Sequence, residues 1–318
     1  MVKCKECGKE FKTERSLHAH IKAHSLTVSE YYQKHYPRYD LYSGKLITFK
    51  DKKLYFKKDF NSLSNFRRWV ETEDSKIVKQ YCSDLISNRI KERGIKYSMS
   101  QIELRSLKMP SVRIYNNLFG DYYKLCSSLG LENKFQNFDS IEDLKNPDLD
   151  DYTIYIDSRE QKPLIFKGRS TEVRGLKFGD YAFENDKVEC KCRIERKSLA
   201  DLVGTLSPHN FERFGKEIER ARDHDSHLVI LVESSLRHAT SFDFLRKSRS
   251  KERIYKDTKI TPQFLLRQIR RLMQEYPFIQ FLFVDGRREA SRIVQKIFEH
   301  GEIYKKIDLQ HAYDMEKL

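Results

Sequence analysis

The sequence lacks a long apolar run, an apolar N-terminal segment and a dense set of cysteines. No stretch of 18 or more consecutive apolar residues occurs, so we expect no helix that spans a membrane. The chain begins MVKCKECGKE, without the apolar core of a secretory signal, and we therefore expect an intracellular protein. Six cysteines in 318 residues do not indicate a disulfide scaffold. In a reducing compartment, cysteines close together in the sequence are first of all candidate metal ligands.

Positive charge, in contrast, is abundant. The chain has 61 Lys and Arg residues against 47 Asp and Glu, which gives a formal net charge of +14. This balance predicts a polyanionic partner, although charge alone does not separate nucleic acid from a membrane surface. A chain of 318 residues is long enough for two or three domains.

Two cysteines and two histidines near the start have the spacing C-x2-C-x12-H-x3-H. They are Cys4, Cys7, His20 and His24. Thiolates and imidazoles at this spacing suit tetrahedral zinc. The segment resembles a C2H2 zinc finger, which implies a small ββα fold over residues 1–25 around a structural Zn2+ ion. Three cations of the finger are candidate contacts to DNA phosphates, and a protein-binding finger is the alternative. These cations are Lys12, Arg15 and Lys22.

A helical region follows a basic, Tyr-rich extension at residues 26–73, whose aromatic side chains we interpret mainly as the core of a small domain. Residues 74–135 show helical periodicity. Their second half resembles the small helical repeats attached to phage and homing endonucleases, which implies a DNA-binding module; a plain helical spacer is the alternative. The candidate DNA contacts in it are Ser111, Arg113, Asn116 and Asn117. Residues 136–151 are acidic and polar and predict a linker.

Between Ile154 and Asp201, three strand-like pieces each carry an acidic residue at a strand edge. These residues are Asp157, Asp180 and Glu195. Lys197 shares a strand face with Glu195, because side chains two residues apart point the same way. Carboxylates gathered at one sheet edge repel one another unless a cation lies between them. Oxygen ligands suit Mg2+ or Mn2+. From Tyr152 onward strands and helices alternate, which predicts an α/β core.

The pattern D-x-R-E, G-D-Y, E-R-K-x-x-x-D resembles the XPF-type structure-selective endonucleases, a branch of the restriction-enzyme-like PD-(D/E)xK nucleases. The resemblance implies a C-terminal α/β restriction-endonuclease-like domain over residues 152–301, with a tail at 302–318. The catalytic set that it implies is Asp157, Arg159, Glu160, Asp180, Glu195, Arg196, Lys197 and Asp201.

The resemblance also implies a role for each member of this set. The three strand-edge carboxylates would hold Mg2+ or Mn2+, and Lys197 would orient or deprotonate the attacking water. Arg159 and Arg196 would pair with carboxylates or clamp the phosphate. Glu160 would reach a second ion or an outer-shell water, and Asp201 would orient Lys197 or Arg196.

XPF-type nucleases commonly carry a C-terminal tandem helix-hairpin-helix domain, but only 17 residues follow Gly301. We therefore expect the N-terminal modules to supply targeting. The sequence predicts a multidomain, metal-dependent DNA endonuclease of phage or mobile-element type, located in the bacterial cytoplasm if it is phage-encoded. Its partner would be DNA, with the nuclease domain as the surface of any homodimer. The alternatives are a branched-DNA structure-selective repair or recombination nuclease, and a DNA-binding regulator with an inactive nuclease fold.

Overall fold

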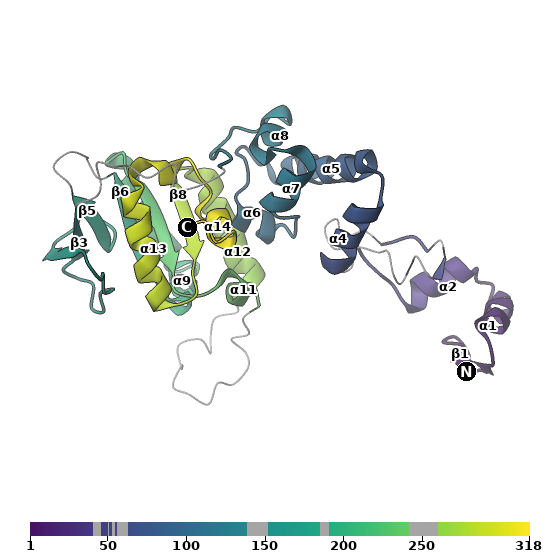
Figure 1. Cartoon of the computed structure of the whole chain (residues 1–318). Helices are drawn as coiled ribbons and strands as arrows, with labels where there is room; N and C mark the ends of the chain where they lie inside the picture. The colour runs from purple at the N-terminus through teal and green to yellow at the C-terminus, as the bar shows by residue number, and fades with distance from the viewer. Residues whose placement is uncertain are drawn as a thin grey trace. The chain divides into compact units, whose positions relative to one another are not determined.

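The chain forms two compact units, Met1–Asn88 and Arg89–Leu318. The structure is a computed structural model, drawn in Figure 1, and it describes residues 1–40, 46–49, 51–52, 55, 63–138, 152–184, 191–241 and 260–318. None of the helices in these ranges is long and apolar enough to cross a membrane. The expected linker at 136–151 falls mostly outside the described residues.

The N-terminal unit starts with a two-stranded antiparallel sheet, β1 (Val2–Lys3) and β2 (Glu10–Phe11). Thr13 caps the helix that follows, because its side chain accepts a hydrogen bond from the backbone N–H of Ser16 at 3.2 Å. The further elements of the unit are α1 (Glu14–Ile21), η1 (Lys22–His24), α2 (Val28–His35), α4 (Leu63–Thr72) and the first part of α5 (Ser75–Arg93).

The core of this unit is small and rich in tyrosine. Leu17 and Ile21 of α1 pack against Tyr31 and Tyr32 of α2, and all four are buried. Two hydrogen bonds hold α2 in place, one from the backbone N–H of Lys5 to the Tyr31 hydroxyl at 2.8 Å and one between His18 of α1 and Tyr32 at 3.1 Å. The burial of these rings supports the interpretation of the Tyr-rich segment as core.

The C-terminal unit contains a six-stranded mixed sheet in the order β4-β3-β5-β6-β7-β8. The strands are β3 (Thr153–Asp157), β4 (Ser170–Arg174), β5 (Tyr181–Glu184), β6 (Cys192–Lys197), β7 (His227–Val232) and β8 (Ile279–Phe283). Only β5 runs antiparallel to its neighbours, β3 and β6. This strand direction brings the end of β3 and the start of β5 to one edge of the sheet.

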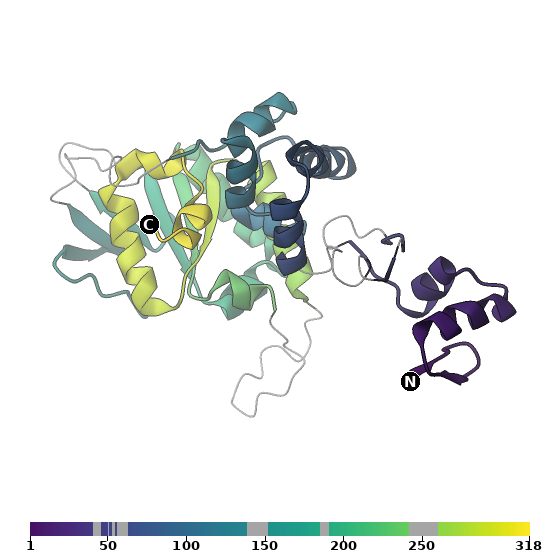
Figure 2. The same cartoon turned by 45° about the vertical axis from the view of Figure 1, so that its right-hand side comes forward.

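Helices cover both faces of this sheet, as Figure 2 shows for the face under α13 (Arg287–Glu299). Along β7, Val229 and Leu231 face the α13 core, whereas Leu228, Ile230 and Val232 face the opposite core. The opposite face is covered by α9 (Leu199–Thr205), α10 (Phe211–Asp223), α11 (Leu236–Ala239) and α12 (Pro262–Glu275). The α/β layers predicted from the alternating pattern are therefore present.

The segment expected to form a separate helical module belongs largely to this same unit. It contains α6 (Gln101–Ser106), α7 (Val112–Phe119) and α8 (Tyr122–Ser128). α6 packs on α12 and on α14 (Leu309–Asp314), and Ile102 is part of the core between the sheet and α9–α12. The division into units falls at Asn88–Arg89 rather than within 136–151.

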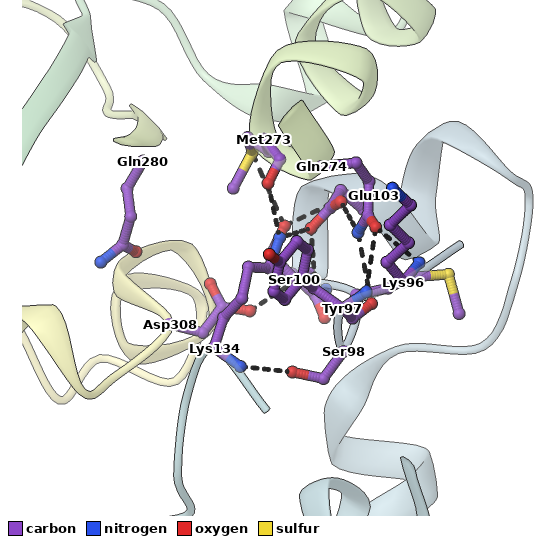
Figure 3. Close-up of polar contacts among 12 residues, drawn as sticks. Lys96, Tyr97, Ser98, Ser100, Glu103, Lys134, Met273, Gln274, Gln280 and Asp308 are labelled. Carbon is purple, nitrogen blue, oxygen red and sulfur yellow. Dashed lines mark hydrogen bonds and ion pairs between the residues drawn. The ribbon is translucent and has the colours of Figure 1, made fainter. Parts of the chain in front are cut away.

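A buried polar network joins α6 to α12 (Figure 3). Lys134 pairs with Glu103 at 2.6 Å, and the two side chains are only 1% and 0% exposed. Gln274 on α12 donates to Glu103 at 2.7 Å and accepts from the backbone N–H of Tyr97 at 3.1 Å. Charges buried this deeply need such partners, so the network fixes how these elements pack.

Residues 302–318, expected to be a tail, contribute to the core instead. Tyr304, Ile307 and Leu309 are at most 2% exposed and pack in the α13 core with Leu318. Asp308 caps α14 and also accepts from the backbone N–H of Gln101 at 2.6 Å. The final segment therefore connects the sheet to α6.

Candidate active site

Adjacent strand ends bring the predicted acidic residues to one place. Asp157 ends β3, and its backbone N–H donates to the carbonyl of Asp180 at 2.9 Å. Asp180 lies just before β5 and binds β6 twice, through its N–H to the Ile194 carbonyl and through its carboxylate to the N–H of Arg196, both at 2.7 Å. Glu195 and Lys197 on β6 are thus held beside Asp180.

Gly179 makes this close approach feasible. Its φ is +73°, and a Cβ there would lie 3.1 Å from the Cβ of Arg193 and 3.3 Å from the carbonyl of Ile194. Any other residue would combine backbone strain with a clash against β6. The glycine of the G-D-Y pattern thus has a physical reason.

The site opens into a cleft of about 640 Å³ between the sheet edge, α9 and α10. Asp157, Arg159, Asp180, Glu195, Lys197 and Asp201 of the predicted set all line it. Glu160 and Arg196 do not line it and pair with each other beside it at 2.9 Å.

Three carboxylates share the floor of this cleft with a single ammonium group. Burial, and then repulsion from Glu195, raises the pKa of Asp180 to about 7. Burial and contact with Glu195 raise the pKa of Glu217 to about 7 as well. Burial opposes the charge on Lys197, yet its pKa is raised because Glu195 accepts a hydrogen bond from Nζ at 2.7 Å. Five carboxylates line the cleft against Lys197 and three arginines, and Glu195 lies among acids whose pKa it raises, which fits a site for a cation.

Glu217 was missed by the sequence reasoning. It lies on α10, three residues after Phe214 and one before Ile218, so it shares the helix face that packs on the sheet. A glutamate within that apolar stripe was the available signal. Arg213 and Arg220 of the same helix also line the cleft.

Asp157, which we expected to hold a metal ion, instead accepts hydrogen bonds from neighbouring residues of the protein. Its carboxylate accepts from the backbone N–H and the Nε of Arg159, both at 2.7 Å, and from the N–H of Leu176 at 2.8 Å. These bonds, the guanidinium first, lower the pKa of Asp157 to about 2. Asp157 is 2% exposed, whereas the side chain of Arg159 is 68% exposed. The structure thus presents the arginine rather than the aspartate to the cleft.

The other predicted partners also have settled positions. The guanidinium of Arg196 pairs with Glu160 at 2.9 Å and with Glu233 at 3.1 Å. Of its two expected roles, this is the pairing with carboxylates. Asp201 lies in the first turn of α9 and accepts a hydrogen bond from the hydroxyl of Ser198 at 2.7 Å. Its bonded partner is therefore Ser198, whereas we expected Lys197 or Arg196.

The Cys and His residues near the N-terminus form the one ready group of metal-ligand side chains in the parts of the chain that the structure describes. The ligand atoms of Cys4, Cys7, His20 and His24 all lie within 4.8 Å of one another. The His20 Nε2 atom is 3.2 Å from Cys7 Sγ and 3.1 Å from His24 Nε2. Tetrahedral zinc with bonds of about 2.0–2.3 Å separates its ligand atoms by roughly 3.3–3.8 Å, so the donor set fits this ion.

The predicted carboxylates of the C-terminal cleft do not meet as closely. Within the described ranges, Asp157, Asp180 and Glu195 do not belong to any such group of three. The set Asp180, Glu195 and Glu217 does not form such a group in these ranges either. Asp157 is paired with Arg159, whereas Glu195 interacts with both Asp180 and Glu217, so these three carboxylates are the candidates to hold a divalent ion.

The predicted DNA contacts divide into exposed and internal side chains. Exposed ones are Lys12, Arg15, Lys22, Arg113 and Asn117. Ser111 is half-buried at the start of α7. Asn116 is used inside the fold, because it accepts from the N–H of Tyr122 at 2.8 Å and donates to Asn137 at 2.9 Å. This bonding argues against a direct role of Asn116 at a nucleic-acid surface.

Comparison with known proteins finds a family match in the C-terminal unit. Residues 156–297, somewhat less than half of the chain, match the ERCC4 domain, which supports a nuclease domain over this range. No curated protein matches the chain.

Two solved structures are similar to the chain. XPF from Aeropyrum pernix is 16% identical, with a TM-score of 0.33, over 52% of this chain and 69% of that one. XPF from Aeropyrum pernix in complex with DNA is 18% identical, with a TM-score of 0.32, over 46% and 62%.

Proposed function

We propose that the protein is a metal-dependent DNA endonuclease that hydrolyses phosphodiester bonds in the cleft of its C-terminal unit. The observation that carries the proposal is the gathering of Asp180, Glu195 and Glu217 around Lys197 in one cleft, within residues that match the ERCC4 domain. Asp180 and Glu195 would hold a Mg2+ or Mn2+ ion, with Glu217 in reach and Asp157 available only if it leaves Arg159. Such an ion lowers the pKa of water and offsets charge on the transition state.

The side chains of the cleft supply the remaining chemistry. The raised pKa of Lys197 favours an ammonium that orients the attacking water and neutralises developing charge over one that removes a proton. Arg159, exposed to the cleft, is suited to bidentate contact with the scissile phosphate. Arg196, held between Glu160 and Glu233, instead fixes the β6 edge.

A zinc finger is the proposed role of the N-terminal Cys and His residues. The purified chain should contain about one zinc per molecule, and the Cys7→Ser substitution should remove most of it. Metal analysis by mass spectrometry measures this directly, with Cys82→Ser as the control, since Cys82 is buried away from the cluster. Undiminished zinc in the Cys7→Ser variant would contradict the assignment.

Targeting by the N-terminal unit is tested with a panel of DNA substrates. We expect the full chain to cut linear duplex at preferred positions, and residues 89–318 to cut more weakly and with less preference. The division of the structure at Asn88–Arg89 sets this truncation point. Mapping products on duplex, flap and four-way junction DNA compares the two proteins. Preference for the junction or flap by both proteins would instead favour the structure-selective function.

A further inference from the structure

A second hollow, of about 450 Å³, lies beside the candidate active site and shares Phe178 with it. Four cationic side chains and a histidine line this hollow, which we call the basic pocket: Arg174, Lys177, Lys191, Arg193 and His224. None of the described residues that line it carries a carboxylate. A concave surface of this charge fits an anion.

The cations are held in place at exposed positions. Arg174 pairs with Glu184 at 3.0 Å and Lys191 with Asp225 at 2.8 Å, and Arg174, Glu184 and Asp225 are between 42% and 87% exposed. Exposed ion pairs of this kind contribute little free energy. A bound anion can therefore replace Glu184 and Asp225 as the partner of Arg174 and Lys191 with little loss of stability. Lys177 Nζ lies only 3.2 Å from His224 Nε2, and Arg193 lies 5.8 Å from the centre of the Phe178 ring.

The chain ties this pocket to the candidate active site. Arg193 and Glu195 are two residues apart on β6, so both project from the same face of the strand at a separation of about 6.8 Å. Lys177 and Phe178 lead directly into Gly179 and Asp180, and the neighbouring Leu176 donates its N–H to Asp157 at 2.8 Å. A strand of DNA whose scissile phosphate lies at Lys197 therefore has a flanking phosphate within reach of the pocket.

We propose that the basic pocket binds a phosphate group of the DNA strand that is cut, next to the scissile bond. The inference rests on the proposed nuclease function and adds to it a phosphate site outside the catalytic cleft. The phosphate belongs either to an internal linkage or to a strand end, and the two sources are distinguishable by experiment.

The test measures DNA binding without divalent metal, so its readout does not depend on cleavage. The proteins are wild type, the double variant Lys177→Gln/Arg193→Gln, the charge-keeping double variant Lys177→Arg/Arg193→Lys, and Lys167→Gln as a control outside both hollows. The double glutamine variant should reduce the slope of log affinity against log salt by roughly 0.7–0.9, the value for one lost phosphate contact. The arginine–lysine variant and Lys167→Gln should keep the wild-type slope.

Oligonucleotides with one neutral methylphosphonate linkage then locate the phosphate. Neutralising a single linkage next to the cut site should weaken wild-type binding but not binding by the double glutamine variant. A loss seen instead on removing a 5′-phosphate would assign the pocket to a strand end. Equal salt slopes and equal methylphosphonate patterns for wild type and the double glutamine variant would overturn the proposal. If the wild-type protein cuts no DNA but its DNA binding still depends on Lys177 and Arg193, the nuclease function is contradicted and the phosphate site is not.

Discussion

The Asp180→Asn variant should cleave DNA on the order of 10²–10³-fold more slowly than wild type at saturating DNA, while its DNA affinity stays nearly unchanged. Asp180 is anchored to β6 by its backbone and by the N–H of Arg196, so the amide fits the same space. The substitution removes the charge that would attract a divalent ion. Lys197→Met should produce a loss of the same order, because Lys197 is the only cation bonded to Glu195 in the described site.

Single-turnover cleavage and binding measured side by side check this result. Asp223→Asn is the matched control, since this residue ends the same α10 helix that carries Glu217 but is 65% exposed. We expect its rate to equal that of wild type. Wild-type cleavage by purified Asp180→Asn or Lys197→Met would remove these residues from the catalytic site.

The Lys134→Met variant should lower the free energy of unfolding of the C-terminal unit by about 3–5 kcal/mol. The substitution leaves the buried carboxylate of Glu103 with two neutral donors, the N–H of Ser100 at 2.8 Å and the amide of Gln274 at 2.7 Å. Because Glu103 is fully buried, water cannot replace the lost ammonium. Figure 3 shows Glu103 of α6 among its polar contacts with Lys134 and Gln274.

Urea unfolding of the full chain and of residues 89–318 measures the effect. Arg271→Met is the control on α12, since its pair with Glu275 spans 3.8 Å and both side chains are about half exposed. An exposed pair of this kind contributes at most about 1 kcal/mol. Similar small changes for Lys134→Met and Arg271→Met would mean that the buried pair does not hold the unit together.

The features that could be predicted from the sequence depend on patterns of neighbouring residues along the chain. The alternation of apolar strands and helices predicted the layers, because burial on both sheet faces leaves continuous apolar runs such as His227–Val232. The acidic residues at strand edges line one cleft, because neighbouring strands end together; their role as a catalytic site stays a prediction. The spacing of Cys4, Cys7, His20 and His24 predicted a cluster that the fold brings together.

Features that depend on tertiary packing were not accessible in this way. Glu217 reaches the site only because α10 packs its apolar face on the sheet, which brings one polar member of that face over the strand ends. The sequence predicted Asp157 as a metal ligand, but the turn after β3 places the guanidinium of Arg159 on its carboxylate. The helical segment looked like a separate module, because Gln274 and Asp308, the partners of Glu103 and Gln101, lie far away in the sequence.

The most direct test of the account is DNA cleavage by the purified full chain with and without divalent metal. We predict cleavage with Mg2+ or Mn2+, none in EDTA, and recovery when Mg2+ is added back in excess. Asp180→Asn should remain inactive under all three conditions. Cleavage that persists in EDTA, or Mg2+-dependent cleavage of equal rate by Asp180→Asn, would contradict a metal-dependent nuclease site in this cleft.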